Sequence, residues 1–283
     1  MRSLLFVPAD QEKKIATALA SGADVVILDL EDSVAPAAKP AARRLAAEVL
    51  GSPRSGHMPR LYVRLNALDS GLAGADLEAV LPARPDGLMQ PKTQKGGDVA
   101  ELARLSGATL PIIAIVTETA RALFQCGTYD EAGPALCGMA WGAEDLSNDL
   151  GARSSRDDDG RLAEPYRLAR TLCLAGARAA GVEPIDTVHV NFRDLAGLEA
   201  ECAAAARDGF GAKMAIHPAQ VEIVNRVFTP SGAAIAEAQA VIAAFAAAGD
   251  AGVVAIDGRM FDIPHLKRAQ KLLARARALH LVA

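Results

Sequence analysis

The chain contains the stretch Ile112-Ile113-Ala114-Ile115-Val116-Thr117-Glu118, in which an apolar run is followed by an acid. Two more stretches share this form. They are Val25-Val26-Ile27-Leu28-Asp29-Leu30-Glu31-Asp32 and Ala135-Leu136-Cys137-Gly138-Met139-Ala140-Trp141-Gly142-Ala143-Glu144-Asp145. A continuous apolar run predicts a strand that is covered on both faces, as in a parallel sheet. Because chemistry in a barrel of such strands sits at their C-terminal ends, we expect these acids to lie at one rim.

Strand-like and helix-like segments alternate around these stretches. Eight segments have the apolar character of strands, and helical spacing follows each of them. The expected strands cover residues 4–7, 24–30, 61–65, 87–91, 111–117, 135–141, 186–191 and 211–216. Eight βα units in series predict an α/β fold of the TIM (β/α)8 barrel type. An open doubly wound sheet is the alternative, although such sheets rarely contain eight regular units.

Turn residues interrupt the pattern at Thr229-Pro230-Ser231-Gly232. We therefore predict a barrel over residues 1–228 and a C-terminal helical extension over residues 229–283. The extension is expected to contain an Ala-rich helix, a short strand-like piece and a final helix. It is too small to fold alone, so we expect it to pack on the barrel or on a neighbouring subunit.

Composition excludes several classes of protein. The 283 residues are 51% hydrophobic and only 4% aromatic, which indicates an aliphatic core, and the net charge of −4 offers no basic face for nucleic acid. The apolar run at the N-terminus is too short for a signal peptide, and no run of about 18 apolar residues predicts a membrane span. The motifs of serine hydrolases, P-loop proteins and Rossmann folds are missing. Four cysteines without C-x-x-C spacing favour reduced thiols in a cytoplasmic protein.

Glu118 and Asp145 are the acids that we select as a metal pair. Both follow apolar strands directly, so both are expected at the same rim. Mg²⁺ commonly takes one or two protein carboxylates and completes its shell with water and substrate. The alternative is that each acid caps the following helix, because the helix dipole stabilises an acid at a helix N-terminus. Spacing alone leaves both interpretations open.

Arg64 ends the third expected strand and would present a planar fork to a carboxylate, a thioester oxygen or an enolate. A salt bridge to Glu31 or Asp32 is a compatible alternative, and these two acids would then orient Arg64 and metal-bound water. His217 follows the eighth strand, where its place at the rim favours a ligand contact. Lys92 ends the fourth strand and is a Schiff-base candidate, but nothing in its sequence neighbourhood indicates desolvation.

At these positions the chain resembles the citrate lyase beta-subunit-like family, and within it the citramalyl-CoA and malyl-CoA lyase-like branch of the aldolase/citrate lyase superfamily. The motifs that carry the resemblance extend over nearly the whole chain. They are Arg2-Ser3-Leu4-Leu5-Phe6-Val7-Pro8, Leu28-Asp29-Leu30-Glu31-Asp32-Ser33-Val34, Val63-Arg64-Leu65-Asn66, Thr117-Glu118-Thr119-Ala120, Gly142-Ala143-Glu144-Asp145-Leu146, Asn191-Phe192-Arg193-Asp194, Ile216-His217-Pro218 and Met260-Phe261-Asp262-Ile263-Pro264-His265-Leu266-Lys267-Arg268-Ala269-Gln270. The resemblance implies a TIM barrel, in agreement with the order of the elements.

The resemblance also implies roles for individual residues. It makes Glu118 and Asp145 the Mg²⁺ ligands, and Arg64 the contact to substrate and enolate. It makes Asp262 the catalytic acid/base, contributed to the active site of an adjacent subunit in a homotrimer; the same residue is expected to cap the helix that begins at Ile263. The residues that it places at the CoA site are Phe6, Lys13, Ile216 and His217. Thr17 departs from the pattern, because relatives carry a second CoA-binding lysine there.

The activity implied by the resemblance is that of a Mg²⁺-dependent carbon–carbon lyase. It would cleave or form a short 3-hydroxyacyl-CoA such as citramalyl-CoA or malyl-CoA, with acetyl-CoA and a 2-keto acid on the other side of the reaction. Three alternatives remain: a citrate lyase beta subunit acting on a carrier-bound citryl thioester, a pyruvate aldolase using free aldehydes, and a non-catalytic acyl-CoA-binding protein. The direction of reaction, including hydrolysis of the thioester, stays open.

Overall fold

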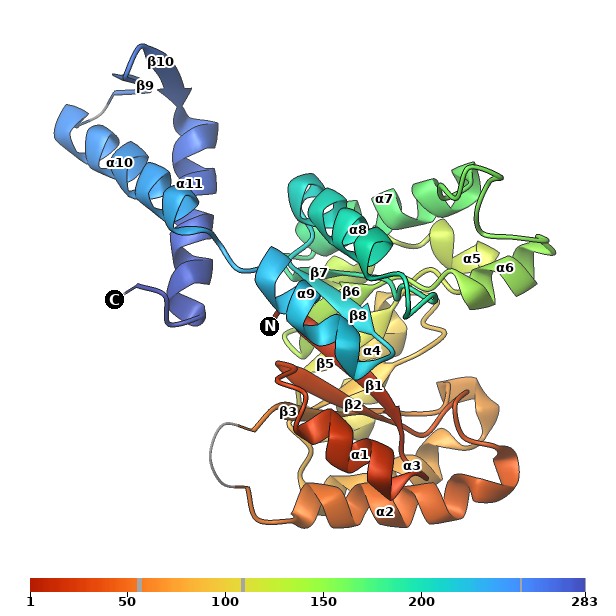
Figure 1. The fold of residues 1–283 in the computed structure, drawn as a ribbon. Coiled ribbons are helices and arrows are strands. Elements are labelled where there is room, and N and C mark those ends of the chain that lie inside the picture. Colours follow the sequence, from red (N-terminus) through yellow and green to blue (C-terminus); the bar gives the residue numbers. More distant parts are fainter. Residues whose placement is uncertain (55–57, 108–109, 250, 283) are drawn as a thin grey trace. The chain divides into compact units, whose positions relative to one another are not determined.

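The computed structural model describes residues 1–54, 58–107, 110–249 and 251–282. The chain divides into two compact units, the barrel unit (Met1–Asn225) and the C-terminal unit (Arg226–Ala283). In the barrel unit, eight strands close into a barrel in sequence order (Figure 1). The predicted α/β barrel fold is thereby confirmed.

All neighbouring strands of the barrel are parallel, and β1 pairs with β8 to close it. The strands are β1 (Ser3–Pro8), β2 (Val25–Asp29), β3 (Arg60–Arg64), β4 (Gly87–Gln90), β5 (Ile112–Ile115), β6 (Leu136–Ala140), β7 (Glu183–Asp186) and β8 (Ala212–Ala215). Every residue of β2, β4, β5 and β8 is buried. This burial explains the apolar runs of β2 and β5, because one face fills the barrel and the other lies beneath helices.

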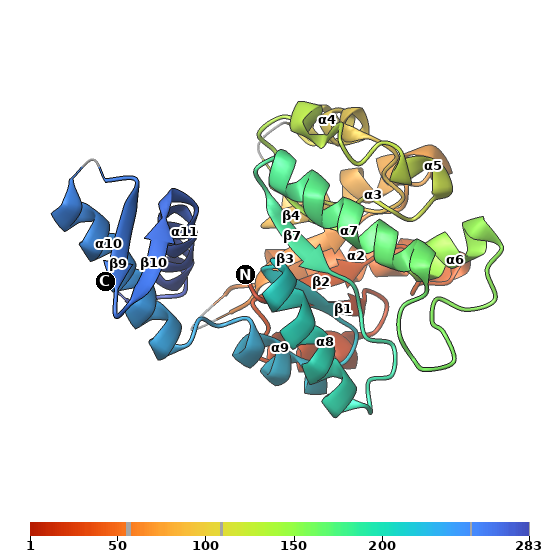
Figure 2. The ribbon, with the colours of Figure 1, turned by 90° about the horizontal axis from the view of Figure 1, so that it is seen from above.

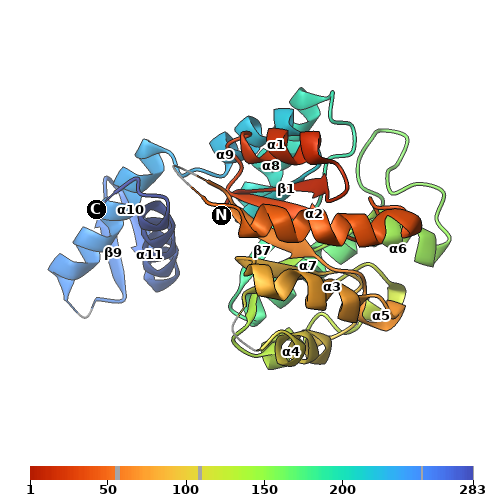
Figure 3. The same ribbon diagram turned by 90° about the horizontal axis from the view of Figure 1, so that it is seen from below.

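Helices surround the strands on all sides, as the views from above and below show (Figure 2, Figure 3). They are α1 (Glu12–Leu19), α2 (Lys39–Gly51), α3 (Ala73–Val80), α4 (Gly96–Leu105), α5 (Ala120–Leu123), α6 (Glu144–Leu150), α7 (Glu164–Ala179), α8 (Leu195–Asp208) and α9 (Val221–Val227), with short 3-10 turns η1 (Pro36–Ala38), η2 (Leu68–Ser70), η3 (Leu81–Ala83), η4 (Tyr129–Ala132) and η5 (Pro218–Gln220). A cluster of buried apolar side chains that includes Leu4, Tyr62 and Ile113 fills the barrel interior. A Cβ on Gly87 would lie 2.3 Å from the Tyr62 ring, so a glycine is required there.

The prediction of the seventh strand was wrong. Strand β7 ends at Asp186, where the predicted strand began. The β-prone residues Thr187 to Val190 outweighed Glu183 and Pro184 in the sequence pattern. Pro184 nevertheless pairs with Met139, and its carbonyl accepts a hydrogen bond from Gly211 N at 3.1 Å. A proline is tolerated at this place because it lies near the start of a short strand.

The C-terminal unit has a small core of its own. It contains α10 (Gly232–Ala248), β9 (Val253–Ile256), β10 (Arg259–Asp262) and α11 (Ile263–Ala278). The two strands form an antiparallel hairpin that turns at Asp257 and Gly258, whose φ angles are +49° and +74°. Positive φ at both turn positions is the type I′ geometry that an Asp-Gly pair favours. We did not predict β10, although the Asp-Gly dipeptide before it indicates a hairpin and could have revealed this strand.

One helical region of the described residues, Pro218–Ala248, is long and apolar enough to cross a membrane by length and composition alone. The region is interrupted by Thr229 and Pro230, and α10 by itself has 17 residues. A spanning helix needs about 20. Helix α10 instead buries Ile235, Val241 and other side chains in the core of the C-terminal unit, packed against α11. We therefore interpret it as a core helix.

Candidate active site

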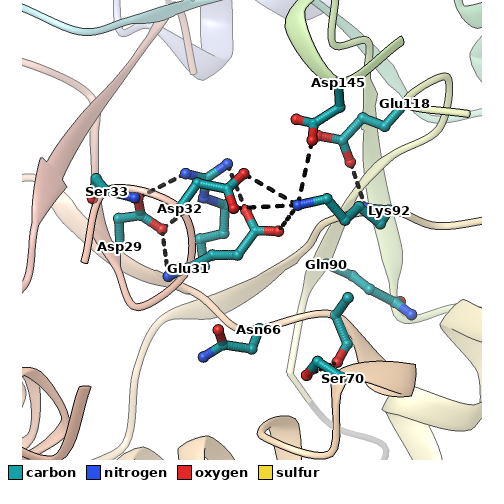
Figure 4. Close-up of polar contacts among 12 residues, drawn as sticks. Asp29, Glu31, Asp32, Ser33, Asn66, Ser70, Gln90, Lys92, Glu118 and Asp145 are labelled. Carbon is teal, nitrogen blue, oxygen red and sulfur yellow. Dashed lines mark hydrogen bonds and ion pairs between the residues drawn. The ribbon is translucent and has the colours of Figure 1, made fainter. Parts of the chain in front are cut away.

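Charged side chains gather where strands β2 to β6 end (Figure 4). Asp29 and Arg64 are the last residues of β2 and β3 and stand opposite each other in the strand register. Lys92 follows β4, Glu118 follows β5 and Asp145 follows β6. The barrel thus brings together the metal pair and the arginine that the sequence predicted for one rim, and it adds Asp29 and Lys92 to them.

The guanidinium of Arg64 is held by two acids. Its Nε and Nη2 donate to the two carboxylate oxygens of Asp29, each at 2.7 Å, and its Nη1 lies 2.9 Å from Oε2 of Glu31. Burial alone would raise the pKa of Asp29, but the charge and hydrogen bonds of Arg64 outweigh it, so this pKa lies below its usual value. The ring of Phe6 lies 4.8 Å from Cζ of Arg64. The predicted salt bridge to Glu31 is present, and Asp29 is a partner that sequence reasoning missed.

The ammonium of Lys92 connects three acids from two segments of the rim. Its Nζ lies 2.5 Å from Oε1 of Glu31, 3.1 Å from Oδ2 of Asp32 and 3.4 Å from Oδ1 of Asp145. Burial would lower the pKa of Lys92, but its hydrogen bond to Glu31 and the neighbouring carboxylates raise it above its ordinary value. A Schiff-base lysine requires a lowered pKa. The acidic partners of Lys92 and its raised pKa therefore do not support a Schiff-base role for this lysine.

Glu118 is buried, with 3% of its surface exposed. Its Oε2 accepts a hydrogen bond from the backbone N–H of Lys92. Desolvation raises the pKa of Glu118 to about 8, and the charges of Glu31 and Asp145 add to this effect. A Cβ on Gly142 would lie 2.9 Å from Cγ of Glu118, so the close approach of that backbone depends on a glycine. Burial and the nearby acids disfavour the negative charge of this carboxylate, and a bound cation would offset that effect.

The helix-capping alternative applies differently to the two acids. Helix α5 is capped by Thr119, whose Oγ1 accepts from Ala122 N at 3.2 Å, so Glu118 is not its cap. Asp145 lies in the first turn of α6, where the helix dipole stabilises a negative charge. About a third of the Asp145 side chain is exposed. Asp145 can therefore interact with the helix dipole and with a ligand at the same time.

The residues at the rim fit a magnesium ion. Two carboxylates from neighbouring βα units, the buried Glu118 and the partly exposed Asp145, match the one or two protein carboxylates that commonly bind Mg²⁺. Within the described ranges, no three His, Cys, Asp or Glu side chains form a ready-made metal cage. A structural zinc site would have four such ligands. Glu118 and Asp145 could thus hold Mg²⁺ with water and substrate as its remaining ligands, and this assignment stays a prediction.

The predicted CoA residues lie on β1, on α1 and in the segment that follows β8. Phe6 is half-buried in β1, and Lys13 is exposed on α1. Ile216 is 40% exposed, and the ring of His217 stacks on Phe192 with their centroids 4.7 Å apart. Because β1 and β8 are paired, these residues belong to neighbouring segments of the barrel unit. The structure brings them to one sector, and their contact with CoA stays a prediction.

Asp262 lies in the C-terminal unit at the start of α11. Its Oδ1 accepts from the backbone N–H of His265 at 3.3 Å and contacts the His265 ring. The hydrogen bond from that side chain lowers the pKa of Asp262. The predicted cap is therefore present. The Asp262 side chain is 39% exposed, and the exposed side chains of Met260 and Ile263 flank it in sequence. Its catalytic role stays a prediction.

Lys39 is a further residue near the rim that the sequence did not single out. Its buried Nζ donates to the carbonyl oxygens of Leu30 and Glu31, at 2.8 and 2.9 Å, and to Oδ1 of Asn66 at 2.7 Å. It thereby fixes the backbone that carries Glu31. Lys39, Glu31 and Lys92 line a cavity of about 400 Å³ beside the rim. No local motif marks Lys39, because its partners lie on other elements.

Known proteins match the chain along nearly its whole length. A family model described as HpcH/HpaI aldolase/citrate lyase matches residues 2–218. A second model, described as a C–C bond lyase of the TIM-barrel fold, matches residues 165–280. A protein of Cereibacter sphaeroides named (3S)-malyl-CoA thioesterase is 40% identical over 280 residues, which are 98% of this chain and 95% of that protein.

Two comparisons come from Mycobacterium tuberculosis. A protein named citrate lyase subunit beta-like protein is 39% identical over 272 residues, which are 96% of this chain and 94% of that protein. The crystal structure of protein CitE in complex with magnesium, acetoacetate and coenzyme A is 39% identical, has a TM-score of 0.80 and covers 97% of both chains. These matches extend over the barrel and the C-terminal unit alike.

Proposed function

The chain belongs to the HpcH/HpaI aldolase/citrate lyase family, and we propose that it is a Mg²⁺-dependent lyase acting on a short 3-hydroxyacyl-CoA thioester. The family resemblance expected from the sequence is thus confirmed, and with it an enzyme of the carbon–carbon lyase type. The proposed substrates are malyl-CoA or citramalyl-CoA, and the proposed products are acetyl-CoA and a 2-keto acid. The observation that carries the proposal is the buried Glu118 carboxylate beside Asp145 at the rim that also holds Arg64.

Each rim residue has a task in the proposed reaction. Cleavage removes the proton of the 3-hydroxyl, breaks the bond between the second and third carbons of the acyl group, and leaves an acetyl-CoA enolate and a 2-keto acid. Glu118 and Asp145 would hold Mg²⁺, which when bound would supply Lewis-acid polarisation of the keto-acid oxygen. Arg64 stabilises the negative charge that develops on the thioester oxygen. Asp262 accepts the hydroxyl proton and, in the reverse direction, takes a proton from the methyl group of acetyl-CoA.

Relatives support the cofactor and substrate class. The protein CitE of Mycobacterium tuberculosis was crystallised with magnesium, acetoacetate and coenzyme A. We propose that this chain likewise uses Mg²⁺ and a CoA thioester, with CoA near Phe6, Lys13, Ile216 and His217. We further propose that it works in the cytoplasm as a homotrimer in which Asp262 completes the site of a neighbouring subunit.

A second candidate function is hydrolysis of the thioester. It is favoured by the Cereibacter sphaeroides relative, which is named (3S)-malyl-CoA thioesterase and is 40% identical to this chain. In that reaction the carbon–carbon bond survives, and water attacks the thioester carbonyl to release free CoA. The same Arg64 contact would serve it, since negative charge again develops on the thioester oxygen.

A small panel of thioesters tests the proposed function. Purified protein is incubated with malyl-CoA, citramalyl-CoA or citryl-CoA, each with Mg²⁺ and with a chelator, and the products are separated by chromatography. The proposal predicts that at least one thioester yields acetyl-CoA and the matching 2-keto acid only when Mg²⁺ is present. Binding without turnover of any thioester would favour the non-catalytic alternative. Cleavage of free aldol substrates that CoA thioesters do not inhibit would favour the aldolase.

A further inference from the structure

Lys92 touches both of the proposed metal ligands through different groups. Its backbone N–H donates to Oε2 of Glu118, and its Nζ lies 3.4 Å from Oδ1 of Asp145. Figure 4 shows the ammonium between Asp145 on one side and Glu31 and Asp32 on the other. The family resemblance gives this lysine no role. The structure nevertheless places its ammonium among Glu31, Asp32 and Asp145 at the rim.

The backbone of Lys92 is shaped for this position. Its φ angle is +51°, a left-handed conformation that residues with a Cβ adopt uncommonly. Pro91, which precedes it, is buried, and the N–H of Lys92 points at Glu118. The side chain then extends toward Glu31, Asp32 and Asp145. The left-handed backbone conformation of Lys92 thus positions both the N–H that donates to Glu118 and the ammonium.

We propose that Lys92 is a positioning residue that acts as the resident counter-ion of the metal site. In the metal-free protein its ammonium offsets the repulsion among the rim carboxylates. When a divalent cation binds to Asp145 and Glu118, the ammonium withdraws from Asp145. Lys92 therefore lowers the affinity for metal and stabilises the metal-free protein. This inference rests on the proposed function, because it assumes that Glu118 and Asp145 hold the metal.

The surroundings of Lys92 allow such a withdrawal. Its Nζ lies closer to Glu31 and Asp32, at 2.5 and 3.1 Å, than to Asp145. These two acids and Lys92 line the cavity of about 400 Å³ beside the rim, and the Asp32 side chain is 55% exposed. The ammonium can therefore give up its contact with Asp145 and keep two negative partners in a hydrated space. Its positive charge therefore stays paired with Glu31 and Asp32 after the withdrawal.

Metal affinity of charge variants tests the inference. Lys92→Met keeps the backbone N–H and most of the side-chain length but removes the charge. It should bind Mn²⁺ about tenfold more tightly or better, the change that Coulomb's law gives in water for charges of +2 and +1 about 5 Å apart. Lys92→Arg should stay within about threefold of wild type, since it keeps the charge. Free Mn²⁺ is followed by electron paramagnetic resonance during titration, and competition then gives the Mg²⁺ affinity.

Two controls separate this inference from the proposed function. Lys95→Met removes an exposed lysine on the same loop and should leave the affinity unchanged. Asp145→Asn should abolish binding alone and in combination with Lys92→Met. If wild type binds no Mn²⁺, the proposed metal site is wrong and the inference falls with it. If wild type binds and Asp145→Asn does not, equal or weaker binding by Lys92→Met overturns the inference alone.

Stability provides a second readout that needs no catalysis. Without metal, Lys92→Met should unfold at a lower temperature than wild type, and saturating Mn²⁺ should raise its midpoint by more than it raises that of wild type. If the variant is unfolded without metal, recovery of the folded signal on addition of Mn²⁺ supports the inference. A variant that stays unfolded in saturating Mn²⁺ overturns it, because the metal should replace the lost counter-ion.

Discussion

Arg64 and Asp29 form a two-point ion pair across the ends of β3 and β2, with both N–O distances at 2.7 Å. Asp29 is itself fixed, because its oxygens accept from the backbone N–H groups of Glu31 at 3.0 Å and Ser33 at 3.2 Å. The orientation of the guanidinium is therefore set by the loop that follows β2. An arginine held in this way presents its remaining donors without reorganisation when charge develops on a substrate.

The first prediction concerns the fork of Arg64. Arg64→Lys keeps the charge but loses the paired donors, so turnover should fall about 10²-fold or more. The matched control is Arg2→Lys, because Arg2 makes a similar two-point pair with Asp24 before the first two strands begin. That control should change stability and leave turnover alone. Loss of stability with unchanged kinetics in Arg64→Lys would reduce Arg64 to a structural ion pair.

The second prediction concerns the space around Glu118. Gly142→Ala places a Cβ 2.9 Å from Cγ of Glu118 and must displace this carboxylate. Metal affinity should fall about tenfold or more, since overpacking costs about 1–3 kcal/mol. Gly74→Ala is the control, because a Cβ there has nothing within 4 Å. Both affinities are measured by titration with Mn²⁺. Unchanged affinity in Gly142→Ala would show that the position of Glu118 does not control the metal.

The third prediction concerns acid stability away from the rim. Glu201 on α8 lies 3.0 Å from Nδ1 of His189 and 3.6 Å from the buried Nζ of Lys213. Burial alone would raise its pKa, but the adjacent His189 ring and the charges of Lys213 and Arg156 lower it from 4.5 to about 2. Because the folded pKa is the lower one, this stabilisation is complete above pH 4.5 and is lost as pH falls toward 2.

Thermal unfolding at several pH values checks this assignment. Glu201→Gln should unfold at a lower temperature than wild type near pH 7, because it leaves the buried Lys213 with one acid fewer. The difference between the two proteins should shrink between pH 4.5 and 2, as wild-type Glu201 becomes protonated. A difference that stays constant over this range would mean that the ion pairs of Glu201 contribute no net stability.

The fourth prediction is that the active site is shared between subunits. Asp262→Asn should fold and bind metal but turn over poorly. Co-expressed Asp262→Asn and Asp145→Asn subunits should recover part of the activity, because some interfaces then pair an intact metal site with an intact Asp262. Each variant expressed alone is the control. No recovery in verified mixed oligomers would return Asp262 to a capping role in its own subunit.

The apolar strands and the acids behind them were predictable from local pattern. Glu118 and Asp145 follow apolar runs that are readily recognised as buried strands, and Arg64 ends a third strand. The partner of Arg64 was misjudged in part, because Asp29 looked like an interior strand residue, and only the parallel register places it opposite Arg64. The catalytic role predicted for Asp262 came from family resemblance alone, since a cap and a catalytic acid look the same in sequence.

The features that could not be predicted from the sequence depend on long-range contacts. Lys39 and Lys92 act through partners on other elements, at separations that no local pattern encodes. The seventh strand was misplaced because Thr187 to Val190 are intrinsically better strand formers than Glu183 and Pro184. Pairing with β6 and β8 decided the position instead. Tertiary pairing outweighs β-propensity in such cases.

Identification of the products of malyl-CoA tests the central claim most directly. Wild type and Asp145→Asn are incubated with this thioester and Mg²⁺ in water enriched in ¹⁸O, and the products are analysed by mass spectrometry. The lyase account predicts equal amounts of acetyl-CoA and glyoxylate from wild type, and neither from Asp145→Asn or after removal of Mg²⁺. Release of free CoA with ¹⁸O-labelled malate, without acetyl-CoA, would contradict it and assign the chain to thioester hydrolysis.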